Sequence, residues 1–229
     1  MTSSAAKERF ANIAGRYDFM NHLLSLDMDK GWREAAAEEA MLGRKSFRVL
    51  DSATGTGDLA FAVYDEARNE GKSVRMTATD FVREMLDIAV EKAKRTKRAP
   101  IDFRLVDSLK TGFRSGSFDV VITGFALRNF DSVDRFLAEA YRVLSPRGRL
   151  VILEMAMPDL PAQRLRFALY SYVMRFASIF AGKEYGWLVD SIEAFDKKAL
   201  KASVRRTGFR SVRMRSLRSG VAYLLVADK

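Results

Sequence analysis

The chain has 229 residues, of which 48% are hydrophobic and 30% are charged, a composition typical of a globular domain and not of a disordered or fibrous chain. A chain of this length buries roughly 70% of the surface that it exposes when unfolded, so its fold needs no disulfide or structural metal. It contains no cysteine and a single histidine, His22, which excludes a disulfide scaffold, a Cys/His zinc site and a thiol nucleophile. We therefore expect no metal site.

The net charge of +10 is concentrated near the C-terminal end of the sequence. Residues 197–229 hold ten Lys and Arg against one acid, Asp228, so the other 196 residues carry a net charge of only +1. Such a cationic segment attracts anionic lipid, and it attracts nucleic acid whatever the base sequence. An ordinary solvated strand and helix explains the same composition equally well.

Two further sequence patterns bear on where in the cell the protein is located. Residues 1–9 have no apolar core after their charges, so we expect no signal peptide and a cytoplasmic protein. The longest mostly apolar run, 167–181, is fifteen residues long and contains Arg175. It is shorter than the ~20 residues that span a bilayer, so peripheral contact is the only membrane association that the sequence leaves open.

Strand and helix patterns alternate in the first two thirds of the chain. Residues 4–40 read as helical, and the helix expected from Asp131 is stopped by Pro146 and Gly148. We expect strands at 48–53, 74–80, 101–106, 118–123 and 150–154, and further helices at 57–68 and 82–97. This alternation predicts a parallel sheet covered by helices on both faces.

The alternation ends after residue 154. Residues 158–187 read as a long aromatic helical insertion, followed by a helix at 196–207 and β-rich runs at 209–216 and 221–227. The link at 218–220 is short enough for those runs to pair as an antiparallel hairpin. We therefore predict an α/β fold with a doubly wound, mostly parallel, Rossmann-like sheet of seven strands, an antiparallel C-terminal hairpin, and a cap of N-terminal and inserted helices.

A glycine-containing loop follows the first expected strand. Asp51, Gly55, Thr56 and Gly57 lie where this strand turns into its helix; the glycines let backbone approach a ligand, and the helix N-terminus offers free N–H groups. The pattern also fits a dinucleotide site if Ala60 fills its third position, and a glycine pair can equally form a tight turn.

Acidic and hydroxyl residues follow the next two strands. Asp80 ends the second strand about twenty residues after the glycines, where an acid accepts hydrogen bonds from both ribose hydroxyls, and it is also placed to cap the next helix. Asp107 and Ser108 follow the third strand, where a side chain reaches an adenine amino group; a solvated turn is an equally natural interpretation.

These residues, with the terminal hairpin, resemble the class I S-adenosylmethionine-dependent methyltransferases, and more narrowly the C-methyltransferases of menaquinone and ubiquinone biosynthesis. The resemblance spans residues 10–227. Its most specific segments are 17–21 (YDFMN), 50–59, 125–129 (FALRN), 141–150 and 185–192. The resemblance implies a single methyltransferase domain, 1–229, with residues 1–40 as a helical cap and 158–190 as an insertion lining the acceptor site.

The resemblance also implies the cofactor, S-adenosyl-L-methionine, and its contacts. Thr56 would lie in the glycine loop, Asp80 at the ribose, and Asp107 with Ser108 at the adenine. Gly124 occupies a position where relatives often present a serine, so its contact would be through backbone only. Thr54 stands where a glycine is usual, and residues 145–148 replace a lysine-proline-glycine-glycine turn.

Methyl transfer requires little side-chain chemistry, because a sulfonium methyl is already electrophilic and mainly needs alignment and exclusion of water. A ring-carbon nucleophile also needs an adjacent hydroxyl to lose its proton, which a base or a cation assists. Arg128 is our first candidate for the cation that stabilises the oxyanion, because it follows a strand at the ligand-binding rim, as do Asn129 and Glu154. The alternative is that Arg128 is structural and pairs with a carboxylate such as Asp131.

Tyr17, His22 and Tyr185, the last near the end of the insertion, are further candidates for proton transfer or ring stacking. A lone histidine is more often a surface or packing residue, although its pKa lies near neutrality.

The family resemblance implies a prenylated quinol as the acceptor, and residues 160–180 supply apolar side chains to meet its tail. We expect this helix to rest on an anionic membrane surface, while a homodimer interface or a buried helix would explain the same composition. Other small aromatic, lipid or RNA acceptors are alternatives, as are a dehydrogenase and a non-catalytic binding protein. Nucleic acid is disfavoured because the sequence contains no recognisable RNA-binding module.

Overall fold

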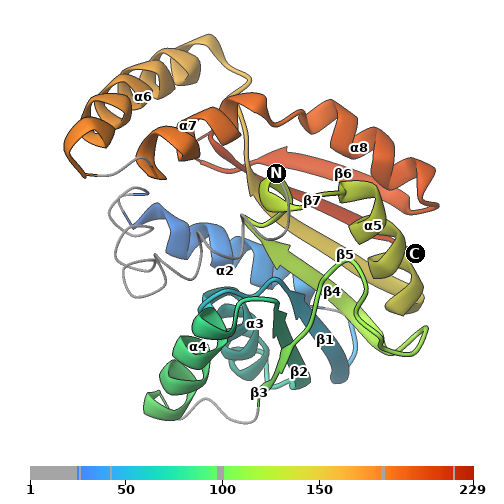
Figure 1. Cartoon of the computed structure of the whole chain (residues 1–229). Helices are drawn as coiled ribbons and strands as arrows, with labels where there is room; N and C mark the ends of the chain where they lie inside the picture. Colours follow the sequence, from blue (N-terminus) through green and yellow to red (C-terminus); the bar gives the residue numbers. More distant parts are fainter. Residues whose placement is uncertain (1–24, 26, 42, 97–100, 182–183, 219) are drawn as a thin grey trace.

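The structure, a computed structural model, describes residues 25, 27–41, 43–96, 101–181, 184–218 and 220–229, and the side chains of 176–185 are not described. One seven-stranded sheet has the order β3-β2-β1-β4-β5-β7-β6 (Figure 1). Its parallel strands are β1 (Ser46–Ser52), β2 (Ser73–Asp80), β3 (Ile101–Leu105), β4 (Phe118–Gly124) and β5 (Leu144–Met155). The last two, β7 (Ala222–Asp228) and β6 (Arg210–Ser216), form the predicted antiparallel hairpin beside β5.

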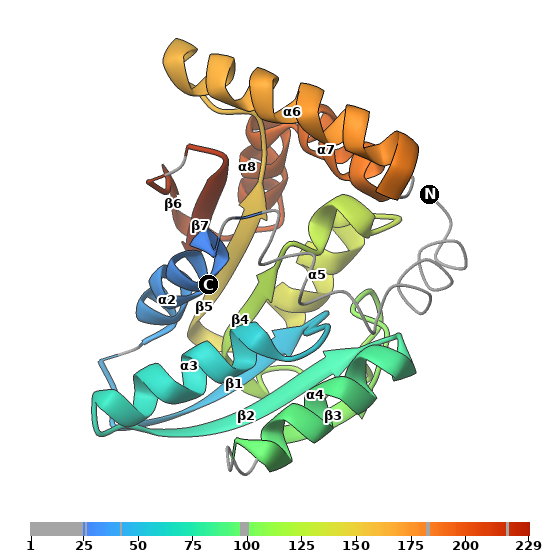
Figure 2. The same cartoon turned by 90° about the vertical axis from the view of Figure 1, so that its left-hand side faces the viewer.

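Helices cover both faces of the sheet, as the alternating pattern predicted. One face carries α2 (Met28–Ala40), α3 (Asp58–Asn69) and α4 (Arg83–Arg95); the other carries the 3-10 turn η1 (Leu127–Asn129), α5 (Val133–Val143) and α8 (Lys197–Arg206) (Figure 2). The central strand β4 is buried almost throughout because both of its faces meet helices. The strand order reverses between β1 and β4, which places a topological switch point at their carboxyl ends.

The fifth strand begins earlier than the sequence indicated. The helix α5 ends at Val143, and β5 starts at Leu144, so residues 145–148 form an irregular part of the strand and not a turn before it. The register between β4 and β5 shifts between Phe118 and Val120, and Arg147 has a φ of 61°. The prediction was wrong here because proline and glycine mark bulges in strands as well as turns.

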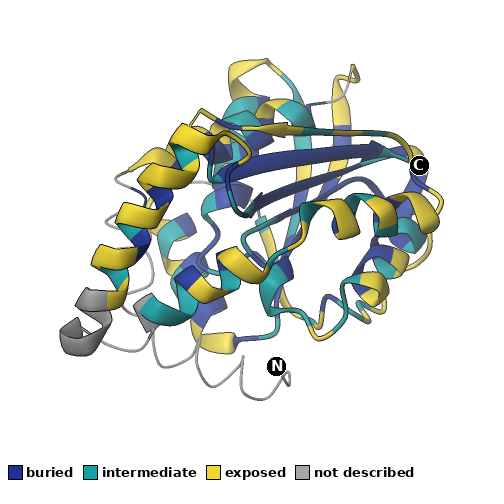
Figure 3. Cartoon of the chain, turned by 90° about the horizontal axis from the view of Figure 1, so that it is seen from above, coloured by how far each residue is buried: buried dark blue, intermediate teal, exposed yellow. Residues whose placement is uncertain are grey.

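The inserted segment forms two helices instead of one. The helix α6 (Pro161–Ala181) is followed by α7 (Glu184–Ala194), which extends seven residues beyond the predicted end at Trp187. Both helices lie beyond the carboxyl end of β5 (Figures 1 and 2). Viewed from above, α6 is largely exposed while the sheet is largely buried (Figure 3).

Of the expected N-terminal helical segment, the structure describes Ser25 and α2. This helix packs against α3 and the face of the sheet through Trp32, Ala36, Ala37 and Ala40. Tyr17 and His22 lie outside the described residues, and the side chain of Tyr185 is not described.

Candidate active site

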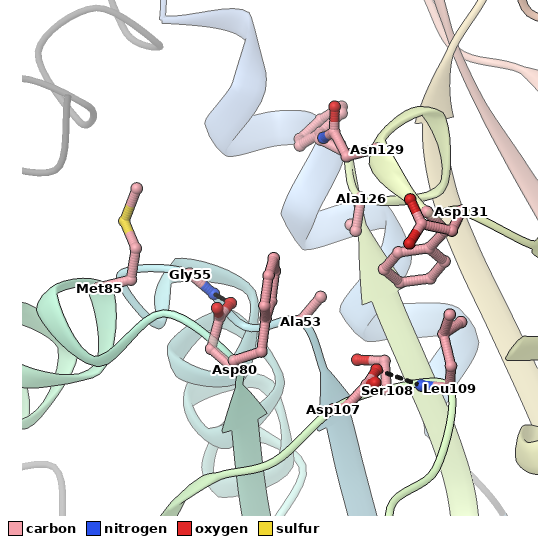
Figure 4. Close-up of a pocket in the computed structure, with 14 residues that line it drawn as sticks. Ala53, Gly55, Asp80, Met85, Asp107, Ser108, Leu109, Ala126, Asn129 and Asp131 are labelled. Atoms are coloured by element: carbon pink, nitrogen blue, oxygen red, sulfur yellow. Dashed lines mark hydrogen bonds between the residues drawn. The ribbon is translucent and has the colours of Figure 1, made fainter. Parts of the chain in front are cut away.

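A cavity of about 120 Å³ opens at the switch point predicted from the topology (Figure 4). The loops after β1, β2, β3 and β4 line it together with the start of α4. Its lining residues are Ala53, Gly55, Asp80, Phe81, Met85, Asp107, Ser108, Leu109, Gly124, Phe125, Ala126, Asn129, Phe130 and Asp131. The sequence-predicted residues Gly55, Asp80, Asp107, Ser108 and Gly124 therefore come together in one place.

The glycine loop takes the tight form that its sequence predicted. Gly55 and Gly57 have φ angles of 57° and 90°, in the left-handed region that glycine adopts freely. A Cβ on Gly57 would lie 3.0 Å from the Phe61 ring and 3.2 Å from Ala89. The loop thus depends on glycine for both its backbone conformation and the close approach of α3 to α4.

Asp80 fixes this loop from the neighbouring strand. Its Oδ2 accepts a hydrogen bond from the Gly55 N–H at 2.8 Å, and its Oδ1 accepts one from the Val82 N–H at 2.9 Å. The helix α4 begins at Arg83 with Val82 as its N-cap, so Asp80 makes a local turn and does not cap the helix as one interpretation had it. Burial raises the pKa of Asp80, while these backbone N–H groups lower it.

Asp107 and Ser108 line the same cavity as Asp80. Ser108 is buried and its hydroxyl accepts a hydrogen bond from the Ser52 hydroxyl at 2.9 Å. Asp107 is exposed, and its Oδ1 accepts a hydrogen bond from the Leu109 N–H at 2.8 Å, which holds the turn after β3 in place (Figure 4).

A second, smaller cavity of about 40 Å³ lies around the glycine loop. It is lined by Arg33, Asp51, Ala53, Thr54, Gly55, Thr56, Asp58, Leu59, Gly124, Phe125 and Leu153. The sequence predicted Asp51, Thr56 and Gly124 here but not Arg33. The buried side of α2 contains Asp29 and Arg33 besides Trp32 and three alanines, and this pair of charges on a largely apolar helix face was the available signal.

Asp51 is fully buried at the base of this cavity. Its Oδ2 accepts a hydrogen bond from the Thr54 hydroxyl at 2.6 Å, and its Oδ1 has no partner in the described part of the chain. Burial raises the pKa of Asp51 to about 7 although the Thr54 hydroxyl lowers it, and the charge of Asp80 raises it further. Thr54 thus supplies a hydrogen bond to the buried acid.

Two non-glycine residues, one after β1 and one after β4, have a left-handed backbone conformation. Ala53 and Phe125 have φ angles of 59° and 57°, and both residues line both cavities. Non-glycine residues in this region cost free energy and are enriched at functional sites. A Cβ on Gly124 would lie 2.9 Å from Leu59 Cδ2, so the Leu59 side chain would have to move to accommodate any larger residue there.

Arg128 lies at the predicted rim but pairs with a different acid from the one we considered. Its Nε donates to Glu154 Oε1 at 2.8 Å, and its Nη1 donates to the Ser191 hydroxyl of α7 at 2.8 Å. The Arg128 and Glu154 side chains are 4% and 0% exposed. Glu154 Oε1 also accepts the Met155 N–H, whereas Glu154 Oε2 and the Tyr223 hydroxyl have no partner among the described residues.

The glycine loop at the switch point, the acid that ends β2 and the β7–β6 hairpin define a class I S-adenosylmethionine-dependent methyltransferase. Comparisons with known proteins give the family: the model of the ubiE/COQ5 methyltransferase family matches residues 1–229, and the chain belongs to this family. The residues present fit the cofactor, because Asp80 ends the correct strand and the buried Asp51 oxygen is available to a polar ligand group.

Individual relatives agree with this assignment. The chain is 42% identical to the demethylmenaquinone methyltransferase of Deinococcus radiodurans over 98% of this chain and 92% of the relative. It is 33% identical to the ubiquinone/menaquinone biosynthesis C-methyltransferase UbiE of Rhizobium johnstonii over 94% of this chain and 85% of the relative.

Solved structures share the fold at low sequence identity. A SAM-dependent methyltransferase from Aquifex aeolicus superposes with a TM-score of 0.62 at 17% identity, covering 86% of this chain and 88% of the other. A phosphoethanolamine N-methyltransferase 2 from Haemonchus contortus, in complex with S-adenosyl-L-methionine, gives 0.61 at 14% identity, covering 86% of this chain and 52% of the other.

Proposed function

We propose that this enzyme methylates a ring carbon of a reduced, prenylated quinone precursor of the demethylmenaquinol or ubiquinol-precursor type. The observation that carries the proposal is the buried arginine Arg128, held at the end of the cofactor-binding strands next to Asn129, which lines the cavity. Such a cation suits an acceptor that develops negative charge on oxygen. The names of the relatives above support the same class of acceptor.

The bound cofactor supplies an electrophilic methyl group, and the chain has to orient the acceptor and stabilise its charge. Carbon methylation forms a ring carbon–methyl bond, breaks the methyl–sulfur bond and finally releases the ring proton. The acceptor is activated when a hydroxyl on the ring loses its proton, because the resulting oxyanion raises electron density at the adjacent carbon. A fixed guanidinium near that oxygen favours this anion without reorganising during the reaction.

The hydrogen bonds of Arg128 leave one part of its guanidinium for the acceptor. Nε is held by Glu154 and Nη1 by Ser191, whereas Nη2 makes no hydrogen bond within the described part of the chain. A guanidinium is a rigid, planar set of donors, so fixing two nitrogens fixes the direction of the third. We propose that Nη2 donates to the quinol oxygen, directly or through a water.

The proposed cap comprises residues 1–40 and 158–190, with Tyr17 and His22 as candidates for proton transfer or ring stacking. A groove of about 1050 Å³ between α2, α6 and the β6–β7 hairpin supports a role in holding the tail. Its apolar lining includes Met28, Trp32, Met155, Phe167, Tyr170, Leu217 and Val221. Trp32 packs 6.1 Å from Phe125, between ring centroids, so the groove lies next to the cofactor cavities.

The outer face of α6 supports peripheral contact of a cytoplasmic enzyme with an anionic membrane. Leu165, Leu169, Tyr172 and Val173 follow helical spacing and are between 50% and 74% exposed. No helix among the described residues is long and apolar enough to cross a bilayer. Arg175 is engaged by Asp190 and Glu193, so the attraction to anionic lipid would come mainly from the basic C-terminal region.

Liposome flotation tests the membrane contact. We expect flotation with anionic vesicles, its loss with neutral vesicles, and its loss when Leu165 and Leu169 are both replaced by serine. If the protein binds neither the anionic nor the neutral vesicles, the membrane contact is refuted. A concentration-dependent dimer that the same double substitution abolishes would assign the face to a homodimer instead.

The acceptor is tested with methyl-labelled cofactor and a panel of reduced, demethylated naphthoquinols and benzoquinols, with the products analysed by mass spectrometry. Carbon-bound label on one ring type supports the proposal and identifies the acceptor. Label on oxygen, on RNA or only on a non-quinol aromatic or lipid in a parallel panel refutes it. Arg128→Ala should reduce turnover and leave the affinity for S-adenosylhomocysteine unchanged.

A further inference from the structure

The two cofactor cavities contain a single cationic side chain among their described lining residues. Arg33 lines the smaller cavity, and no Lys, Arg or His lines the larger one. The acidic side chains that line them are Asp51, Asp58, Asp80, Asp107 and Asp131. A mostly acidic site suits a cofactor with a sulfonium and an ammonium group, but the cofactor also has one carboxylate, and that group needs a cation.

Arg33 has hydrogen-bonding capacity for such a group. Its side chain is 9% exposed and Nη1 pairs with Asp29. Nη2 lies 3.7 Å from Asp58 Oδ2, which is too long for a hydrogen bond, and the guanidinium carbon lies 5.7 Å from the centroid of the Phe125 ring. The guanidinium is thus held by Asp29, by the longer ion pair with Asp58 and by an aromatic face, while Nη2 makes no hydrogen bond among the described residues.

Asp51 gives the same cavity a matching group of opposite charge. It is fully buried, lines the cavity with Arg33, and its Oδ1 has no partner among the described residues. An unpaired buried carboxylate oxygen is costly and is expected to meet a donor in the ligand-bound state. Asp51 thus offers a hydrogen-bond acceptor and Arg33 offers donors in the same cavity. This pair is complementary to the ammonium and carboxylate groups of an amino acid.

Among the described residues, one further cation near the glycine loop, Lys92, does not compete for this role. Lys92 pairs with Asp58, donates to the Thr56 hydroxyl at 3.4 Å, and does not line either cavity. We infer that Arg33, carried by the helix that precedes the sheet, binds the carboxylate of the cofactor's amino-acid moiety, with Asp51 facing its ammonium group. The N-terminal helix α2 therefore contributes directly to the cofactor site.

Calorimetric binding of two ligands tests this inference without any acceptor, and so independently of the proposed quinol methylation. S-adenosylhomocysteine has both the ammonium and the carboxylate, and S-adenosyl-3-thiopropylamine has the ammonium alone. The natural enzyme should prefer the first by at least about tenfold, the range of a charge-assisted hydrogen bond. In Arg33→Gln this preference should fall to about twofold or less, through loss of affinity for the carboxylate ligand only.

Two further variants separate binding from folding. Arg149→Gln removes another partly buried, ion-paired arginine, one that lies outside both cavities, and should keep the full preference. Arg33→Lys should keep part of the preference, and it serves as the test variant if Arg33→Gln does not fold. An unchanged preference in the Arg33 variants, or an equal loss of affinity for both ligands, would overturn the inference.

Discussion

Replacing Arg128 with methionine separates its structural role from its proposed catalytic role. The substitution leaves the fully buried Glu154 carboxylate without its cation. Removing one partner of a buried ion pair costs about 3–5 kcal/mol, much more than an exposed pair is worth. We therefore expect the free energy of unfolding of Arg128→Met at pH 8 to fall by about this amount.

A second substitution should recover most of that loss. Glu154→Gln removes the charge and keeps an oxygen for the Met155 N–H, which Glu154 Oε1 accepts at 2.8 Å. The double variant Arg128→Met/Glu154→Gln should lie within about 1 kcal/mol of the natural chain, because neutral replacement of a buried pair is often tolerated.

Urea unfolding followed by circular dichroism gives the stabilities, and calorimetry with S-adenosylhomocysteine checks the cofactor site. A stable double variant that binds the cofactor product and transfers no methyl group supports the catalytic role. Full activity in that variant would refute this role. A double variant as unstable as Arg128→Met would refute the reasoning about the buried pair.

Three further predictions concern the cofactor site. Asp51→Asn should raise the free energy of unfolding of the ligand-free enzyme above pH 7 by roughly 2–4 kcal/mol, measured by urea unfolding. Folding raises the pKa of Asp51 from 3.8 to about 7, so the natural fold loses stability as the pH rises between these two values. The gain from the substitution should therefore vanish below pH 4. Asp80→Ala, which removes the acceptor for the Gly55 N–H, should weaken S-adenosylhomocysteine binding at least about 100-fold in calorimetry, whereas an unchanged affinity would exclude Asp80 from the site. Gly124→Ser should lower the free energy of unfolding by about 1–3 kcal/mol, because its Cβ would lie 2.9 Å from Leu59 Cδ2, and an unaffected stability would show that Leu59 moves freely.

The parallel core of the fold was predictable because its signals are local. Buried strands such as β4 are short apolar runs, and helices such as α5 repeat apolar residues every three to four positions. The start of β5 was not predictable, because pairing with β4 across a register shift decides whether residues 145–148 form a turn or a strand. That pairing depends on Phe118, 26 positions before Leu144, and local sequence patterns do not contain it.

The same distinction applies to the site. The glycine loop and Asp80 were predicted because each follows directly from the end of a strand, and the structure joins them through the Gly55–Asp80 hydrogen bond. The partner of Arg128 was misjudged because Asp131 is close in sequence, while Glu154 is 26 residues away and is brought near by β5. Arg33 escaped notice for a similar reason, since its place depends on how α2 packs against α3 and the sheet.

The unsatisfied polar groups explain why the site is recognisable without a ligand. Five buried side-chain atoms lack a hydrogen-bond partner in the described part of the chain: Asp51 Oδ1, Thr123 Oγ1, Asn129 Oδ1, Glu154 Oε2 and the Tyr223 hydroxyl. All belong to the carboxyl ends of β1, β4 and β5, to the turn after β4, or to the residue of β7 that pairs with Glu154. Each such group costs about 1–3 kcal/mol unless it gains a partner, so the fold concentrates its cost at one rim. Polar ligand groups that supply those partners recover that free energy on binding, and the charged rim therefore serves recognition at the expense of stability.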